Sequence, residues 1–178
     1  VLTDKKTDWG GSLIRPEATG YGAVYFVEEM LKTRNESISG KVAIISGSGN
    51  VAQFATEKCI QLGAKVISLS DSSGYIWDSE GIDEEKLAFI MDLKNVKRGR
   101  IVSYTQKYPK ASFHAGETPW KLACDIALPC ATQNELDGRD AKILIANGCF
   151  CIGEGANMPC TPEAIELFKK NKLLFAPG

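Results

Sequence analysis

Hydrophobic residues along the chain follow two different spacings. Some form short, nearly continuous runs rich in Val, Ile, Leu and Ala, and others recur every three or four positions over ten residues or more. The first spacing is typical of a buried strand and the second of an amphipathic helix. We therefore expect strands at 41–46, 65–70, 125–129, 143–147, 149–153 and 173–177, with a short extra strand or hairpin arm at 74–78.

Helical spacing fills most of the gaps between these runs. One helix is expected to begin near Pro16, another to run from Asn50 to Gly63, and two more to be capped by Asp83 and Thr161. The first has an apolar stripe of Ala23, Phe26, Val27, Met30 and Leu31. Strands that alternate with helices predict βαβ units. The sequence therefore predicts a doubly wound α/β domain whose mostly parallel sheet is covered on both faces.

Composition places the chain among ordinary globular proteins. Its 178 residues are enough for one domain with a sizeable core, and 44% are hydrophobic and 24% charged. The formal net charge of −1 gives no electrostatic footprint for nucleic acid or an anionic membrane. No apolar run approaches the length that crosses a bilayer, and residues 1–11 lack the apolar core of a signal peptide.

Six cysteines and a single histidine give little reason to expect a metal. The cysteines form no CxxC pair, and His114 has no neighbours at metal-ligand spacing. Cys149 and Cys151 are expected to share one face of a strand as small hydrophobic residues. Six scattered thiols are typical of a reducing compartment, so we expect a cytoplasmic protein.

The segment 41–54, KVAIISGSGNVAQF, joins a strand to a helix through a glycine-rich turn. This arrangement is the one that seats a pyrophosphate. Gly47 permits the tight turn, Gly49 leaves no side chain between backbone and phosphate, and Ala52 keeps the helix close to the strand. The helix amino terminus then offers free N–H groups and the positive end of its dipole. The alternative is a tight turn in a domain that binds nothing.

An acid near the end of the next strand extends the dinucleotide-binding pattern. Asp71 follows Gly47 by 24 residues, at a place where a carboxylate binds a ribose hydroxyl. Such an acid usually favours NAD, because it repels the 2′-phosphate of NADP. Ser72 and Ser73 favour NADP, since both are donors suited to a phosphate. The basic segment 94–100 could fold back to the adenosine end, but we interpret it as a solvated helix end.

Six stretches are too specific to arise from packing alone: GGSLIRPEATGYG, SGSGNVAQ, SLSDSSGYIWD, ALPCATQNELDG, LIANG and EGANMP. Together they resemble the coenzyme-binding domain of the hexameric glutamate dehydrogenases, over essentially the whole chain. SLSDSSG is similar to the NADP-dependent members, in which a strand-end aspartate coexists with NADP. The resemblance thus implies NADP as cofactor, with NAD as the alternative. It also implies hydride transfer between NADP(H) and L-glutamate or 2-oxoglutarate plus ammonia.

The resemblance also implies roles for individual residues. Thr19 and Asn50 would contact the nicotinamide half of the cofactor, and Arg15 would lie near the cleft where substrate meets the ring. Simpler alternatives are surface salt bridges for Arg15, a hydroxyl bonded back to its helix for Thr19, and an ordinary turn for Asn157. The other implied contacts are Ser48, Gly49, Asn50 and Val51 at the pyrophosphate, Asp71 and Ser72 at the adenosine ribose and its phosphate, and Ala131, Thr132 and Asn157 at the nicotinamide ribose.

The chain departs from the family pattern in one respect. Nothing in it matches PGGGKGG or the aspartate segment that follows, where the family carries its catalytic residues. We therefore expect residues 1–178 to form one coenzyme domain that binds cofactor without turnover. The amino-terminal substrate domain and a carboxy-terminal return segment would lie outside it, and the full-length enzyme would be a homo-hexamer. Rival interpretations are a leucine or phenylalanine dehydrogenase and a non-catalytic dinucleotide-sensing module.

Overall fold

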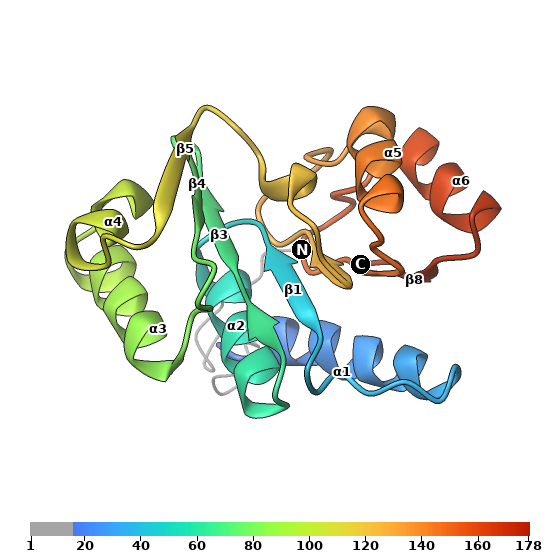
Figure 1. Cartoon of the computed structure of the whole chain (residues 1–178), viewed down its shortest axis with the longest axis horizontal. Coiled ribbons are helices and arrows are strands. Elements are labelled where there is room, and N and C mark those ends of the chain that lie inside the picture. The colour runs from blue at the N-terminus through green and yellow to red at the C-terminus, as the bar shows by residue number, and fades with distance from the viewer. Residues whose placement is uncertain (1–15) are drawn as a thin grey trace, which may run out of the picture.

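A five-stranded parallel sheet lies at the centre of residues 16–178, the part of the chain that the computed structural model describes (Figure 1). Its strands are β1 (Val42–Ile45), β2 (Lys65–Val66), β6 (Ile126–Leu128), β7 (Cys151–Gly153) and β8 (Leu174–Ala176). They are ordered β2–β1–β6–β7–β8, and every neighbouring pair is parallel. The chain therefore leaves β1 toward one side of the sheet and returns, at β6, on the other.

A second, antiparallel sheet comprises β3 (Ser68–Asp71), β4 (Gly74–Trp77) and β5 (Ser112–Ala115). The run 65–70, predicted as one strand, is therefore divided between two sheets. Its first part pairs with β1, and its second part pairs with the hairpin arm β4. The division falls at Ile67, whose N–H still donates to the Ala43 carbonyl of β1 at 3.0 Å. The predicted arm at 74–78 is confirmed as β4.

Helices cover both faces of the parallel sheet. On one face lie α1 (Ala18–Lys32) and α2 (Asn50–Gln61), and on the other α5 (Gly138–Ala146) and α6 (Pro162–Lys170). The shorter helices α3 (Glu84–Met91) and α4 (Tyr104–Lys107) lie on the side of the second sheet (Figure 1). Three further turns are the π-helical η2 (Asp92–Val96) and the 3₁₀ turns η3 (Ile101–Ser103) and η4 (Pro119–Lys121). Along β1, Ala43 and Ile45 pack into a core shared with α1 and α2, whereas Ile44 packs into a second core shared with α5 and α6. Successive side chains of a strand point to opposite faces, so a strand buried on both sides is apolar throughout. The predicted doubly wound α/β fold is confirmed.

Two of the predicted helix caps are present. The Asp83 carboxylate accepts from the Lys86 N–H at 2.9 Å at the start of α3. At the start of α6, Thr161 Oγ1 accepts from the Ala164 N–H at 3.4 Å, and Pro162 is the first helical residue. Both side chains satisfy a donor that the helix itself leaves unpaired.

The prediction of a strand at 143–147 is wrong, because these residues complete α5. Asp137 caps this helix, and its side chain and that of Asp140 form a reciprocal capping box. Ala141 and Leu144 are buried, whereas Ile143 between them is 41% exposed, a burial pattern with the period of a helix. The β-branched composition of the run therefore gave the wrong secondary structure.

The apolar stripe predicted for α1 is also partly wrong. Its buried residues are Gly20, Val24, Val27 and Leu31, whereas Phe26 is 55% exposed. The reason is the close approach of α1 to α2: a Cβ on Gly20 would lie 2.6 Å from Val51 O and from Ala55 N. The helix presents its small residue to its neighbour, which rotates Phe26 outward.

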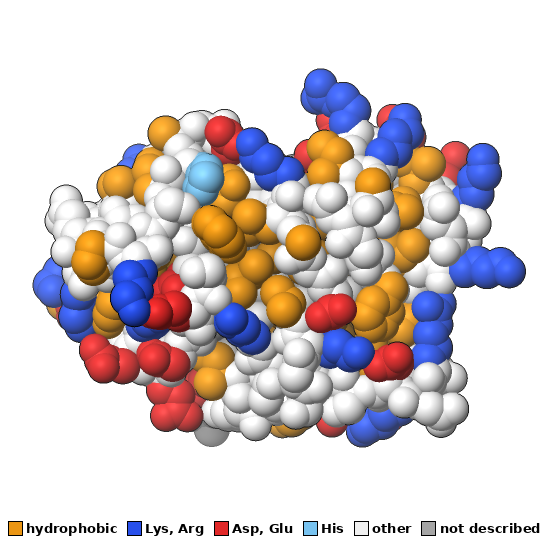
Figure 2. Space-filling model, viewed as in Figure 1, with side chains coloured by type: hydrophobic (Ala, Val, Ile, Leu, Met, Phe, Trp, Pro, Cys, Tyr) orange, Lys and Arg blue, Asp and Glu red, His pale blue; other side chains and the backbone are white. Residues whose placement is uncertain are grey.

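All six cysteines are buried free thiols. Cys149 and Cys151 do not share one face, however, because Cys151 belongs to the core with α1 and α2, and Cys149 to the core with α5 and α6. The strand begins only at Cys151, so Cys149 lies in the turn that precedes it. On the face shown in Figure 2, Lys, Arg, Asp and Glu side chains are intermingled around the rim, and apolar side chains lie nearer the middle.

Candidate dinucleotide-binding site

A cleft of about 610 Å³ opens at the carboxyl ends of β1, β3 and β6. In a doubly wound sheet this is where ligands bind, because the loops separate at the point where the strand order reverses. The cleft brings together nine of the residues predicted at the cofactor: Gly47, Ser48, Gly49, Asn50, Val51, Asp71, Ser72, Ala131 and Thr132.

The two glycines of the turn after β1 have different surroundings. Gly47 has φ +82°, and a Cβ on it would lie 2.9 Å from Cys130 O and 3.1 Å from Ala131 Cα. It must therefore be glycine for backbone and packing reasons alike. A Cβ on Gly49 would meet nothing within 4 Å, and Gly49 lines the cleft directly before α2. The turn thus leaves room for a ligand at the helix amino terminus, where the first N–H groups have no intrahelical partner.

Buried serines hold the turn against its neighbours. Ser70 Oγ accepts from the Gly47 N–H at 2.7 Å, and the Ser70 N–H donates to the Gly47 carbonyl at 2.9 Å. On the other side, Ser46 Oγ accepts from the Cys130 N–H at 2.9 Å. These bonds fix the turn between β3 and the loop after β6.

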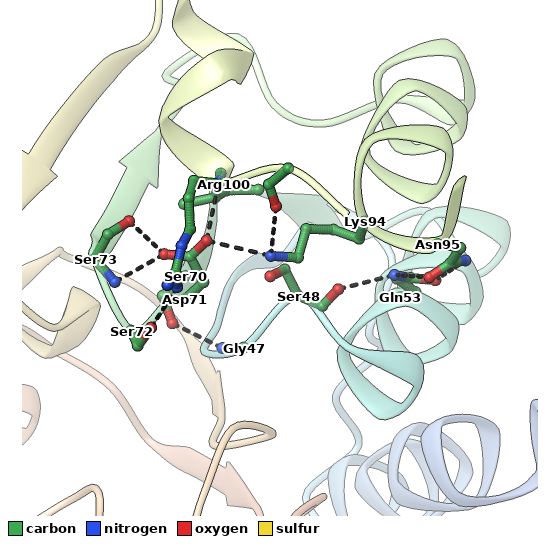
Figure 3. Close-up of polar contacts among 12 residues, drawn as sticks. Gly47, Ser48, Gln53, Ser70, Asp71, Ser72, Ser73, Lys94, Asn95 and Arg100 are labelled. Atoms are coloured by element: carbon green, nitrogen blue, oxygen red, sulfur yellow. Dashed lines mark hydrogen bonds and ion pairs between the residues drawn. The ribbon is translucent and has the colours of Figure 1, made fainter. Parts of the chain in front are cut away.

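Asp71 at the end of β3 has both carboxylate oxygens occupied (Figure 3). Oδ1 accepts from the N–H and the hydroxyl of Ser73, and Oδ2 accepts from the Ile101 N–H at 2.8 Å and from Lys94 Nζ at 3.2 Å. Burial alone would raise the pKa of Asp71, but these donors hold it below its ordinary value. The carboxylate is therefore ionised, neutralised by Lys94 and held by internal partners.

A basic group adjoins this carboxylate. Arg100 lines the cleft, and its guanidinium donates to Ser72 Oγ at 2.6 Å. Lys94 also lines the cleft and donates to the Gly99 carbonyl at 3.0 Å. Lys94, Arg100 and Asp71 together carry one net positive charge, and with the Ser72 hydroxyl they make a site suited to a phosphate.

The interpretation of 94–100 as a solvated helix end is therefore wrong for Lys94, whose side chain is 19% exposed, whereas Arg100 is exposed but also lines the cleft. It holds for Lys97, which is 61% exposed and pairs with Asp92 on the same turn. The difference lies in η2, which places Lys94 and Lys97 on different sides of the segment. Helical periodicity alone could not have revealed it, because a π-helical turn changes which residues share a face.

Glu135 is a further cleft residue that sequence reasoning missed. Its Oε1 accepts from the Ala131 N–H at 2.9 Å and from the Thr132 N–H at 3.2 Å. Burial raises the pKa of Glu135, and the bonds from Ser46, Ala131 and Thr132 oppose that shift. The carboxyl group thus shapes the loop at Ala131 and Thr132. The capping-like spacing within ATQNE was the available signal, because it places an acceptor three and four residues after two loop amides.

Thr19 and Asn157, also predicted at the cofactor, line a second depression of about 260 Å³ between the start of α1 and the loop after β7. Asn50 links the two regions, because its side-chain amide donates to the Pro16 carbonyl at the start of α1. Arg15, predicted near the substrate, lies outside the described residues. The structure therefore gathers most of the predicted residues in one cleft and places two beside it.

Metal ligands are not clustered in this part of the chain. Within residues 16–178 no group of three His, Cys, Asp or Glu side chains is placed to hold an ion. His114 stacks on Tyr75 with ring centroids 4.6 Å apart and bonds to Ser112 Oγ at 2.9 Å. None of the helices described is both long and apolar enough to cross a membrane.

Comparison with known proteins bears on which dinucleotide-binding family the cleft represents. The model of the Glutamate/Leucine/Phenylalanine/Valine dehydrogenase family matches residues 10–178. The chain belongs to this family. The chain is 60% identical over all its residues to the NAD(P)-specific glutamate dehydrogenase of Xylanibacter ruminicola and 54% identical to the NADP-specific glutamate dehydrogenase of Giardia intestinalis.

The similarity to these dehydrogenases extends to solved structures. The crystal structure of Plasmodium falciparum glutamate dehydrogenase superimposes with a TM-score of 0.92 at 49% identity and covers 99% of this chain. This chain corresponds to 38% of that structure and spans about 40% of the length of the curated relatives it matches. Other matched glutamate dehydrogenases are named NADP-specific or NAD-specific, so family membership leaves the choice of nucleotide open.

Proposed function

We propose that this chain is the NADP-binding domain of a glutamate dehydrogenase. A bound NADP(H) would supply hydride to, or accept it from, the carbon that carries nitrogen in L-glutamate. The chain's own residues would bind and orient the cofactor. The turn from Gly47 to Val51 would receive the pyrophosphate, and the loop at Ala131 and Thr132 would border the nicotinamide ribose. In the neighbouring depression, Thr19 and Asn157 would contact the nicotinamide half.

The basic group beside Asp71 is the observation that supports NADP. A free carboxylate at this strand end would repel a 2′-phosphate, but Asp71 is paired with Lys94 and saturated by other donors. Ser72 and Arg100 lie at the same end of the cleft and present a hydroxyl and a guanidinium. The charge of the guanidinium and the hydroxyl donor favour the phosphorylated ribose.

NAD is the second candidate cofactor. The position of Asp71 favours it by the general rule for strand-end acids, and a relative at 51% identity is named NAD-specific. The occupied state of the carboxylate argues against this alternative, because Asp71 would have to release internal donors to accept from a ribose hydroxyl.

Glutamate and 2-oxoglutarate are proposed as substrates because the matched relatives are named glutamate dehydrogenases. We also propose that residues 1–178 form the coenzyme domain of a longer chain. The catalytic and substrate-binding groups would lie in other parts of that chain, except for Arg15, which would lie near the substrate. The longer enzyme would assemble as a homo-hexamer. A leucine or phenylalanine dehydrogenase and a non-catalytic sensor are the rival functions.

An assay of the full-length protein that contains this chain separates these functions. NADPH oxidation would be followed with ammonia and either 2-oxoglutarate, 4-methyl-2-oxopentanoate or phenylpyruvate. We expect 2-oxoglutarate to react about a hundredfold faster or more than the other two, because a site built for a second carboxylate loses pairing with apolar side chains. Preference for an apolar 2-oxo acid would contradict the proposal, and no turnover of any would favour the sensor.

A further inference from the structure

The π-helical turn η2 is tied to the glycine-rich turn by a pair of amide side chains. Gln53 Nε2 donates to Asn95 Oδ1 at 3.1 Å, and Asn95 Nδ2 donates back to Gln53 Oε1 at 3.0 Å. Gln53 Nε2 also donates to the Ser48 carbonyl at 2.8 Å. Figure 3 shows this pair beside Lys94, at the opposite end of the contact network from Ser72 and Ser73. One buried side chain thus contacts both segments that border the cleft.

Neither amide lines the cleft, and the pair joins a buried residue, Gln53, to an exposed one, Asn95. Gln53 is 1% exposed in α2, where a buried amide requires partners for its donors and acceptor. Asn95 supplies two of the three bonds. The arrangement therefore fixes the rotation of η2 relative to α2 without occupying space that a ligand would use.

The π-helical geometry of η2 lets the Gln53–Asn95 pair influence the position of Lys94. In η2 the Lys97 N–H donates to the Asp92 carbonyl, five residues earlier, at 3.0 Å. The wider turn allows Lys94 to reach Asp71 while the next residue, Asn95, faces Gln53. Such turns are rare and are frequently found at functional sites.

We infer that Gln53 and Asn95 are positioning residues that couple the glycine-rich turn to Lys94 and so contribute to discrimination between NADP(H) and NAD(H). This inference rests on the proposed NADP-binding function. Asn95 holds η2 to α2 and is the chain neighbour of Lys94, which only the 2′-phosphate would contact, and without Asn95 the Gln53 amide keeps its own bond to the Ser48 carbonyl. Gln53 acts on Lys94 through Asn95 and on the pyrophosphate turn through Ser48, which both cofactors share.

The two residues therefore have different expected effects on cofactor affinity. Asn95→Ala should weaken NADPH binding about tenfold and change NADH binding less than about twofold, because it frees η2 while Gln53 keeps its bond to the Ser48 carbonyl of the glycine-rich turn. Gln53→Met, which keeps the buried volume, should weaken both cofactors. Val96→Ala is the matched control: Val96 lies on the same turn, is 74% exposed and should leave both affinities unchanged.

A double-mutant cycle tests whether Asn95 acts through Lys94. Calorimetric titration of the chain with NADPH and NADH would be performed for Asn95→Ala, Lys94→Ala and the double variant. If the inference holds, Asn95→Ala has no further effect on NADPH once Lys94 is replaced. Additive effects would overturn it, as would equal weakening of both cofactors by Asn95→Ala.

Folding and the underlying function are checked separately. A thermal melt should show Asn95→Ala and the milder Asn95→Ser folded, and loss of folding in both would overturn a purely positioning role. The wild-type chain provides the remaining test: without a preference for NADPH the proposed cofactor and this inference both fail. A wild-type preference that Asn95→Ala leaves intact would overturn the inference alone.

Discussion

The Nζ of Lys94 lies 3.2 Å from Oδ2 of Asp71, and both side chains are largely buried, with 19% and 8% of their surfaces exposed. This pair changes the meaning of the acid at the end of β3. An unpaired carboxylate there would accept from a ribose and repel a phosphate, whereas the paired one holds the segment from η2 to Ile101 against the cleft. On the proposed function, Asp71 organises the basic group and does not itself select NAD.

Arg100 should be a direct determinant of cofactor preference. Arg100→Ala is expected to weaken NADPH binding about tenfold and NADH binding less than about twofold, because only NADPH presents a phosphate to the guanidinium. Calorimetric titration measures both. Lys97→Ala removes the same charge from the same segment at a 61% exposed position and should leave the ratio unchanged. Equal losses of affinity for both cofactors in Arg100→Ala would mean that Arg100 does not contact the 2′-phosphate.

The two glycines of the turn should separate folding from binding. Gly49→Ala is expected to keep the fold, because its Cβ meets nothing within 4 Å, but to weaken cofactor binding at least about tenfold by filling space beside the phosphate. Gly47→Ala should lower the free energy of unfolding by about 1–3 kcal/mol, because alanine is strained at the positive φ of this position and its Cβ would clash with the Cys130 carbonyl. Urea unfolding and titration of both variants check this. A Gly49→Ala chain that binds normally would contradict the seat proposed for the pyrophosphate.

Gly20 and Gly22, two residues apart in α1, should respond oppositely to alanine. Gly20→Ala would bring a Cβ within 2.6 Å of the α2 backbone, and we expect a loss of about 1–3 kcal/mol. A Cβ on Gly22 meets nothing within 4 Å, so Gly22→Ala should stabilise the helix by about 0.5–1 kcal/mol. Chemical denaturation measures both changes. Similar effects at the two positions would mean that α1 and α2 are not this close.

Stability should fall in acid, partly through Asp78. This buried carboxylate accepts from Lys86 Nζ at 2.9 Å and from Tyr104 Oη at 2.7 Å. Burial would raise the pKa of Asp78, but these bonds and the Glu80 N–H hold it below the ordinary value of 3.8. The unfolded state then binds more protons, so the stability from Asp78 is present above about pH 4 and is lost as the pH falls through the folded-state pKa.

Unfolding in urea between pH 3 and pH 7 tests this assignment. Asp78→Asn should lower stability at pH 7 and flatten the acid side of the profile, because the amide cannot pair with the Lys86 charge. Asp92→Asn, at an exposed pair with Lys97, is the control and should leave the profile unchanged. An unaltered acid slope in Asp78→Asn would assign the loss to other carboxylates, such as Asp71.

Much of the fold followed from the sequence where local signals agreed with one another. At β1 the continuous apolar run predicted a strand that is buried on both faces. At α3 and α6 the capping residues predicted where the helices begin. The failure at 143–147 came from β-branched residues whose helix is fixed instead by the Asp137 capping box. The failure at Phe26 came from tertiary packing, because nothing local indicates that Gly20 faces α2.

The candidate site divides in the same way. Gly47, Gly49 and Asp71 belong to a known sequence pattern with fixed spacing, so the sequence was enough to predict them. Lys94 and Arg100 reach the cleft only because η2 and the loop after it fold back over β3. Glu135 is tied to Ala131 and Thr132 by bonds that depend on loop conformation. These contacts depend on tertiary structure, which residue spacing does not encode.

One titration decides whether the cleft prefers NADP(H): the affinity of the wild-type chain for NADPH and for NADH is measured in the same buffer and salt. The neutralised Asp71 and the cations beside it predict that NADPH binds at least about tenfold more tightly. NADH binding as tightly as NADPH, or more tightly, would contradict the assignment of this end of the cleft to a 2′-phosphate.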